Sequence, residues 1–115
     1  MRIAVFCIVT MAAAIIGAAA DEGSYPAFLH ALHESMAHMQ DAMHRPGTGN
    51  PDRDFALMMI PHHQGAIEMA KVELLYGTDP VLRRLAQEIV ADQQSEINAM
   101  QLWLTKEPGA AKGEK

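Results

Sequence analysis

The stretch DFALMMIPHHQGAIEMA, residues 54 to 70, carries the strongest structural pattern in this 115-residue chain. Its apolar residues recur at the three- and four-residue spacing of an amphipathic helix. Two adjacent histidines, His62 and His63, interrupt that pattern, and Pro61 precedes them. Pro61 should kink the helix, because it leaves the carbonyl of Leu57 without its usual donor. A helix that only packs into a core needs neither the proline nor the two imidazoles.

Helix start and stop signals predict two further helices around this central one. Asn-Pro and Asp-Pro pairs precede the central and third helices, and Pro-Gly or Gly follows each helix. No strand pattern competes, and both connections are short, so consecutive helices should pack antiparallel. We therefore predict an all-α domain at residues 21–107, an antiparallel three-helix bundle or part of a four-helix bundle. The predicted helices cover residues 24–45, 51–76 and 80–105.

The first 20 residues have the pattern of a secretory signal. Arg2 supplies a basic start, residues 3–16 form an apolar run, and residues 18–20 are small. The apolar run is shorter than the roughly 20 residues that span a bilayer, so we expect cleavage rather than a membrane anchor. We predict a signal peptide at residues 1–20, a periplasmic or secreted mature protein, and a polar tail at residues 108–115.

Cysteine usage and charge exclude several kinds of function. The sole cysteine, Cys7, lies in the expected signal, so the mature chain has no thiolate for a disulfide, a nucleophile or a metal. Removing Arg2 leaves 8 basic against 14 acidic residues, a net charge of −6, which argues against nucleic acid as a partner. No zinc-protease helix, paired Glu-x-x-His motif, phosphate loop or nucleophile with a base is found. We therefore expect no enzyme.

Polar residues lie within the apolar stripes of the predicted helices. Projected at 100° per residue, His63 sits at the centre of its stripe, and two polar residues fall within the stripe of the third helix. If the chain turns near residue 78, His63 is level with Gln93. If it turns near residue 48, His63 is also level with His33. The residues expected to converge at this level are His33, Met36, Met59, His63, Gln93 and Glu96.

Two interpretations of this cluster stay open. In the first, a metal-free helical interaction module uses a buried His-Gln-Glu network to fix its register. In the second, the cluster binds metal. Beyond Met1 and Met11 the chain has seven methionines and six histidines, crowded into HALHESMAHMQDAMH and MMIPHH. A methionine stripe is usually packing, but imidazole with thioether suits Cu(I) and Ag(I), and Cu(II) can also be bound. The candidate ligands are His33, Met36, Met58, Met59, His62, His63 and Glu96.

The stretch from residue 54 to residue 104, DFALMMIPHHQGAIEMAKVELLYGTDPVLRRLAQEIVADQQSEINAMQLWL, resembles a bacterial family. That family is catalogued as domain of unknown function three-hundred-and-five and described as a ferritin-like helical domain. Its methionine-methionine-x-proline-histidine-histidine-glutamine core is highly specific. The family motif falls on Met58, Met59, His62, His63, Gln64, Gln93, Glu96 and Met100.

The resemblance implies a copper-related function. Some members of the family are regarded as extracytoplasmic copper-binding proteins of copper resistance, which implies sequestration or transfer of Cu(I) and a copper-transfer partner. An oxidase that exploits bound copper is a third alternative, after the metal binder and the interaction module. A ferritin-like bundle has four helices and this chain offers three, so the fourth position is either empty or filled by a second subunit in a homodimer.

Overall fold

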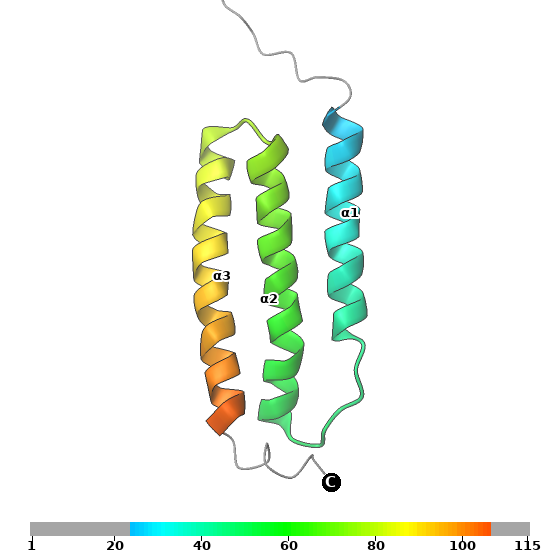
Figure 1. Ribbon diagram of the computed structural model, residues 1–115, viewed down its shortest axis with the longest axis vertical. Helices are drawn as coiled ribbons and strands as arrows, with labels where there is room; N and C mark the ends of the chain where they lie inside the picture. Colours follow the sequence, from blue (N-terminus) through cyan, green and yellow to red (C-terminus); the bar gives the residue numbers. More distant parts are fainter. Residues whose placement is uncertain (1–23, 107–115) are drawn as a thin grey trace, which may run out of the picture.

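The computed structural model describes residues 24–106, which form three α-helices joined by two loops (Figure 1). Helix α1 spans Ser24–Met43, α2 spans Pro51–Tyr76 and α3 spans Pro80–Lys106. Neighbouring helices run antiparallel, and the described residues contain no strand. The all-α prediction is confirmed, with helix bounds close to those expected. The expected signal and tail, residues 1–20 and 108–115, lie outside the described residues.

Side-chain caps start α2 and α3 where the sequence predicts them. The Oδ1 atom of Asn50 accepts hydrogen bonds from the backbone N–H groups of Asp52 and Arg53, at 3.0 and 3.2 Å. Asp79 Oδ1 does the same for two N–H groups in the first turn of α3, both at 2.9 Å. These caps satisfy donors that no helix carbonyl can reach. Local chemistry alone therefore sets where both helices begin.

The register between α2 and α3 also agrees with the prediction. The guanidinium of Arg83 donates to the carbonyls of Leu74 and Gly77, at 2.7 and 2.8 Å, which closes the loop between the helices. Further along the two helices, His63 of α2 pairs with Glu96 of α3 across the seam, which is the line of contact between α2 and α3. Both contacts are consistent with a turn centred near residue 78. A three-residue connection leaves little freedom for any other alignment.

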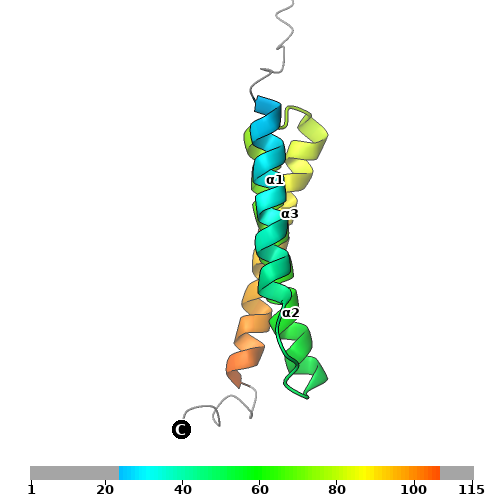
Figure 2. The same ribbon diagram turned by 90° about the vertical axis from the view of Figure 1, so that its right-hand side faces the viewer.

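The three predicted antiparallel helices form an open layer with α2 in the middle. Helices α1 and α3 both pack on α2 but do not contact each other in the described part of the chain. The view turned by 90° superimposes α1 on the other two helices, as a layer requires (Figure 2). Ala56, His63 and Ala70 are buried toward α3, whereas Pro61 and Gly65 are buried toward α1. The sequence pattern did not reveal the side of α2 that is buried against α1, because proline and glycine do not contribute to a hydrophobic pattern.

The register between α1 and α2 differs from the predicted one by about two turns. A Cβ atom built on Gly65 would lie 2.7 Å from Cβ of Met39, so these two residues are level. The rings of Phe28 and Tyr76, with centroids 6.1 Å apart, show the same alignment further along the pair. The prediction had placed His33, rather than a residue near the end of α1, beside the histidine pair.

The loop between α1 and α2 explains the shift. The backbone N–H of Thr48 donates to Asp54 at 2.8 Å, and residues 45–47 lie beside Leu57 and Met58. The loop therefore runs along the first two turns of α2 before the chain reverses. An extended residue advances more than twice as far as a helical one, so a loop treated as a tight turn near residue 48 misplaces α1.

The core of the layer consists mostly of small side chains, and none of the larger ones is fully buried. No helix in the part of the chain that the structure describes is long and apolar enough to cross a membrane. Several large apolar side chains, among them Phe55 and Leu85, remain about half exposed. The buried apolar residues are Ala56, Ile67, Ala70, Val72, Ala86 and Ile97.

Candidate metal centre

The imidazole of His63 lies buried in the seam between α2 and α3, with 7% of the residue exposed. Its Nε2 atom lies 2.5 Å from Oε2 of Glu96. Because an ionised carboxylate can only accept a hydrogen bond, Nε2 carries a proton and donates it. The predicted pairing of His63 with Glu96 is confirmed. The carboxylate holds the ring in one orientation while most of its own side chain stays in solvent.

The other ring nitrogen of His63, Nδ1, is buried and has no hydrogen-bond partner among residues 24–106. A buried polar atom left unpaired costs about 1–3 kcal/mol, so such an atom calls for an explanation. Histidines that bind metal commonly donate their second ring N–H to a carboxylate, as His63 does here. In the neutral ring, Nδ1 then presents a lone pair, which makes it the free donor atom of this pair.

Helix α2 places a methionine one turn before each histidine. Met58 and His62 are four residues apart and so share one edge of the helix, and the same spacing relates Met59 to His63. Met58 and His62 are exposed, whereas Met59 is half-buried. The rings of His62 and His63 have centroids 5.9 Å apart and meet edge to face. The four side chains therefore lie within about one and a half turns of α2.

The α1 residues in the predicted cluster lie elsewhere. With Met39 level with Gly65, His33 is level with residue 71 and Met36 with residue 68, eight and five residues past His63, and both are exposed. These offsets are about 12 Å and about 7.5 Å along the axis, so neither residue lies at the level of His63. The predicted register that brought them to that level is wrong, and as metal ligands both residues stay predictions.

Met43 is the α1 methionine that the observed register brings level with Pro61 and His62. It is half-buried, and it was not among the predicted ligands. The signal that could have found it is Gly65, because a glycine inside a helix often marks a close approach of two backbones.

Gln93 does not join the His63–Glu96 pair as the predicted His-Gln-Glu network would require, within the described residues. Gln93 is half-buried one turn from Glu96, and within the described residues no hydrogen bond joins its amide to His63. Over residues 24–106, no three His, Cys, Asp or Glu side chains are grouped so that they could hold one metal ion. Thioether sulfur is not part of that set of donors.

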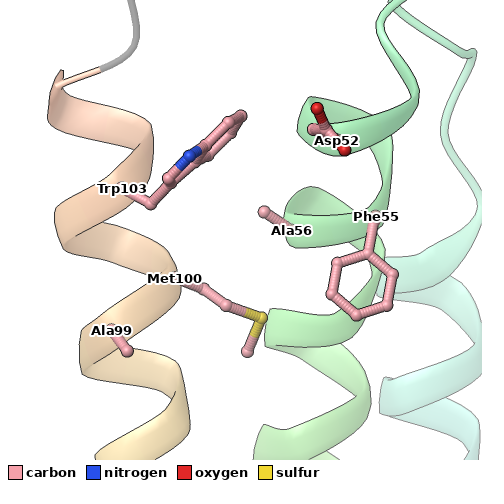
Figure 3. Close-up of a pocket in the computed structure, with 6 residues that line it drawn as sticks. All are labelled: Asp52, Phe55, Ala56, Ala99, Met100 and Trp103. Atoms are coloured by element: carbon pink, nitrogen blue, oxygen red, sulfur yellow. The ribbon is translucent and has the colours of Figure 1, made fainter.

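Two apolar hollows lie along the same seam, one on each side of the His63–Glu96 pair. The first has a volume of about 340 Å³, and in Figure 3 Trp103 and Met100 extend from α3 toward α2 across it, with Phe55 beyond Ala56. The second has a volume of about 300 Å³ and includes Met69. Phe55, His62 and Met69 are spaced by seven residues, so they share one edge of α2 and both hollows open on one side.

The chain is thus a small all-α protein in which three antiparallel helices form an open layer. Its methionine-rich central helix carries a histidine that a carboxylate of α3 holds in place. The family model "Domain of unknown function (DUF305)" matches residues 19–104, and the chain belongs to this family. This confirms the resemblance seen in the sequence.

The chain is also similar to "Uncharacterized protein L153" of Acanthamoeba polyphaga mimivirus. The two are 43% identical over 49 residues, a segment that covers 43% of this chain and 32% of the viral protein. The matched segment thus spans about a third of that relative, and neither description names a function.

Proposed function

We propose that this protein binds Cu(I), and by the same chemistry Ag(I), outside the cytoplasm, for metal sequestration, resistance or transfer. The observation that carries the proposal is Nδ1 of His63, a buried nitrogen with no hydrogen-bond partner in the described part of the chain, in a ring that Glu96 already orients. Imidazole nitrogen and thioether sulfur together suit these soft ions, and the expected mature chain has no thiolate. Copper is cargo here, so no catalytic role is part of the proposal.

The proposed donors are the four neighbouring side chains of α2, with Met43 as a further thioether from α1. Glu96 has a different role, because accepting the Nε2 proton in a hydrogen bond makes the imidazole a stronger ligand. Burial of His63 excludes water from its free nitrogen. The exposed Met58 and His62 give an ion a route between solvent and the seam. The α2 donors are Met58, Met59, His62 and His63.

Matched methionine-to-leucine variants test the proposal. Replacing both Met58 and Met59 by leucine conserves volume, typically at under about 1.5 kcal/mol for each change, but removes both thioethers. We expect the double variant to stay folded and to lose at least about tenfold in Cu(I) affinity, or about 1.4 kcal/mol, in competition with a Cu(I) chelator. Native mass spectrometry gives the stoichiometry, and binding of Cu(II) should be less affected because the imidazoles remain.

Met36→Leu is the matched control, because Met36 lies five residues, or about 7.5 Å along the axis, past the level of His63 in the observed register. This variant should bind Cu(I) as the parent does. Parental Cu(I) affinity in the Met58→Leu, Met59→Leu variant would overturn the assignment of the site to α2.

One observation favours the second candidate, a metal-free helical interaction module. The open layer leaves large apolar side chains such as Phe55 and Leu85 exposed, and the His63–Glu96 pair then serves only to fix the register of α2 and α3. Under this reading none of the methionine variants changes metal binding, since the parent binds no Cu(I) above the level of its exposed histidines.

A further inference from the structure

One face of the layer combines exposed apolar side chains with the candidate metal centre. We call it the seam face and define it by Phe55, His62, Met69, Leu85, Glu96 and Trp103. Phe55 and Met69 lie on the same edge of α2 as His62, and they line the two hollows together with Trp103 and Leu85 respectively. The exposed fractions are 62% for Phe55, 48% for Leu85 and 40% for Trp103.

The apolar area of the seam face approaches what a stable interface needs. Two further side chains border the seam face: Leu82, which lines the second hollow, is 52% exposed, and Met58, one turn from His62, is 47% exposed. A half-exposed side chain of this size offers on the order of 100 Å². Together with Phe55, Leu85 and Trp103, these two side chains offer more than half of the ~800 Å² that each partner buries in a stable protein interface.

Both ends of the seam face are hollowed. Around the first hollow stand the aromatic rings of Phe55 and Trp103. The second hollow has three alanines among larger side chains that include Met69 and Leu85. His62 lies midway between the ends, seven residues from both Phe55 and Met69. A two-fold axis at His62 therefore sets the aromatic rings of one copy against the second hollow of the other, as an isologous contact requires.

We propose that a second copy of this chain covers the seam face, with the two-fold axis at the level of His62 and Glu96. The dimer buries the exposed apolar side chains of the seam face, which the single layer leaves in solvent. It also brings His62 and Glu96 of both copies together beside the axis. Resting on the proposed function, this arrangement gives each His63 centre an imidazole from the other copy, so the metal centre is completed between subunits.

The molar mass in solution tests the dimer. The protein is expressed from the full sequence and freed of metal with a chelator. Its molar mass is then measured by sedimentation equilibrium from about 1 to about 200 µM. We expect a dimer in the parent. Leu85→Glu places a charge within the interface and should raise the dissociation constant at least about 100-fold. Leu75→Glu is the control, since Leu75 is 73% exposed on the opposite side of α2, and it should stay dimeric.

A parent that is monomeric throughout this range overturns the proposal and leaves the seam face to a different protein. Equal behaviour of the Leu85→Glu and Leu75→Glu variants overturns it as well. A monomer that still binds Cu(I) refutes the dimer alone, and a dimer that binds no Cu(I) refutes only the copper proposal.

Disulfide cross-linking tests the position of the axis without relying on a disruptive variant. In a Cys7→Ser background, His62→Cys should form an intersubunit disulfide under mild oxidation, because the two-fold axis brings both copies of position 62 together. Lys71→Cys is the control, since it is exposed on the side of α2 opposite His62. Cross-linking at position 71 but not at position 62 overturns the proposed axis.

Discussion

At the scale of single residues, the His63–Glu96 contact joins a buried ring to a carboxylate whose side chain is 58% exposed. The effect of replacing one partner on the free energy of unfolding therefore depends on whether the group that remains is buried. Without Glu96, neither nitrogen of the His63 ring has a hydrogen-bond partner within the three described helices and their loops, since Nδ1 already lacks one there. We expect Glu96→Leu to lower the free energy of unfolding by about 1–3 kcal/mol, measured by denaturant titration of the metal-free protein.

Glu88→Leu is the matched control for that experiment. Glu88 lies on α3, its side chain is 54% exposed, and it pairs with Arg84 at 3.0 Å one turn away. Exposed pairs of this kind contribute about 0.3–0.5 kcal/mol. Glu96→Gln should keep most of the parental stability, because its amide oxygen can still accept from Nε2. An effect of Glu96→Leu no larger than that of Glu88→Leu would contradict the buried pairing.

At the scale of the elements, the contact of Gly65 with Met39 sets how α1 lies on α2. Gly65→Ala should gain up to about 1 kcal/mol from helix propensity. It also places a Cβ atom 2.7 Å from Cβ and Sδ of Met39, and overpacking of this kind costs about 1–3 kcal/mol. We expect a net loss of stability in thermal or denaturant unfolding. A more stable Gly65→Ala variant would refute the close approach of the two helices.

Met39→Ala supplies the complementary arm of a double-mutant cycle. It removes two of the three crowding atoms of Met39, Cγ and Sδ, and leaves Cβ in place. Part of the loss caused by Gly65→Ala should therefore be recovered in the double variant, with a coupling free energy of at least about 0.5 kcal/mol. Simple additivity would place the two residues out of contact.

The loop between α1 and α2 should show its own pH dependence. Hydrogen bonds from the side chain and backbone of Thr48 hold the pKa of Asp54 below its usual value of 3.8. A carboxyl with a lowered pKa stabilises the fold above its unfolded-state pKa and loses that contribution as the pH falls through its folded-state pKa. The parent should therefore be more stable than Asp54→Asn near neutral pH, and the difference should shrink below about pH 4. A difference that does not change with pH would contradict this role.

At the scale of the whole molecule, side-chain caps begin α2 and α3, and the contacts of α2 with α1 and α3 pack the three helices together. We therefore expect the metal-free protein to be mostly helical in far-UV circular dichroism, since tertiary packing of apolar faces supplies most helix stability. Added Cu(I) should raise the melting temperature without adding helix, because a ligand that binds only the folded state stabilises it by mass action. A metal-free protein without helical bands would show that metal drives folding.

The sequence by itself determined the features that depend on local interactions. Asn50 and Asp79 cap the helices that follow them, and apolar spacing placed His63 in the seam. The three-residue connection between α2 and α3 carried that alignment across to Glu96, so the central contact of the candidate centre could be predicted. The Met-His pairs of α2 are likewise local, because a four-residue spacing places two side chains on one edge of any helix.

Only the tertiary structure decided how α1 lies and how open the layer is. The loop from residue 44 to residue 50 has no periodicity from which its path along α2 could be read. Gly65, which sets the register, has no side chain and so leaves no trace in a hydrophobic pattern. This long-range contact puts Met43, and not Met36, level with His62. It also places α1 and α3 on opposite sides of α2, because a helix with two buried stripes packs a neighbour on each.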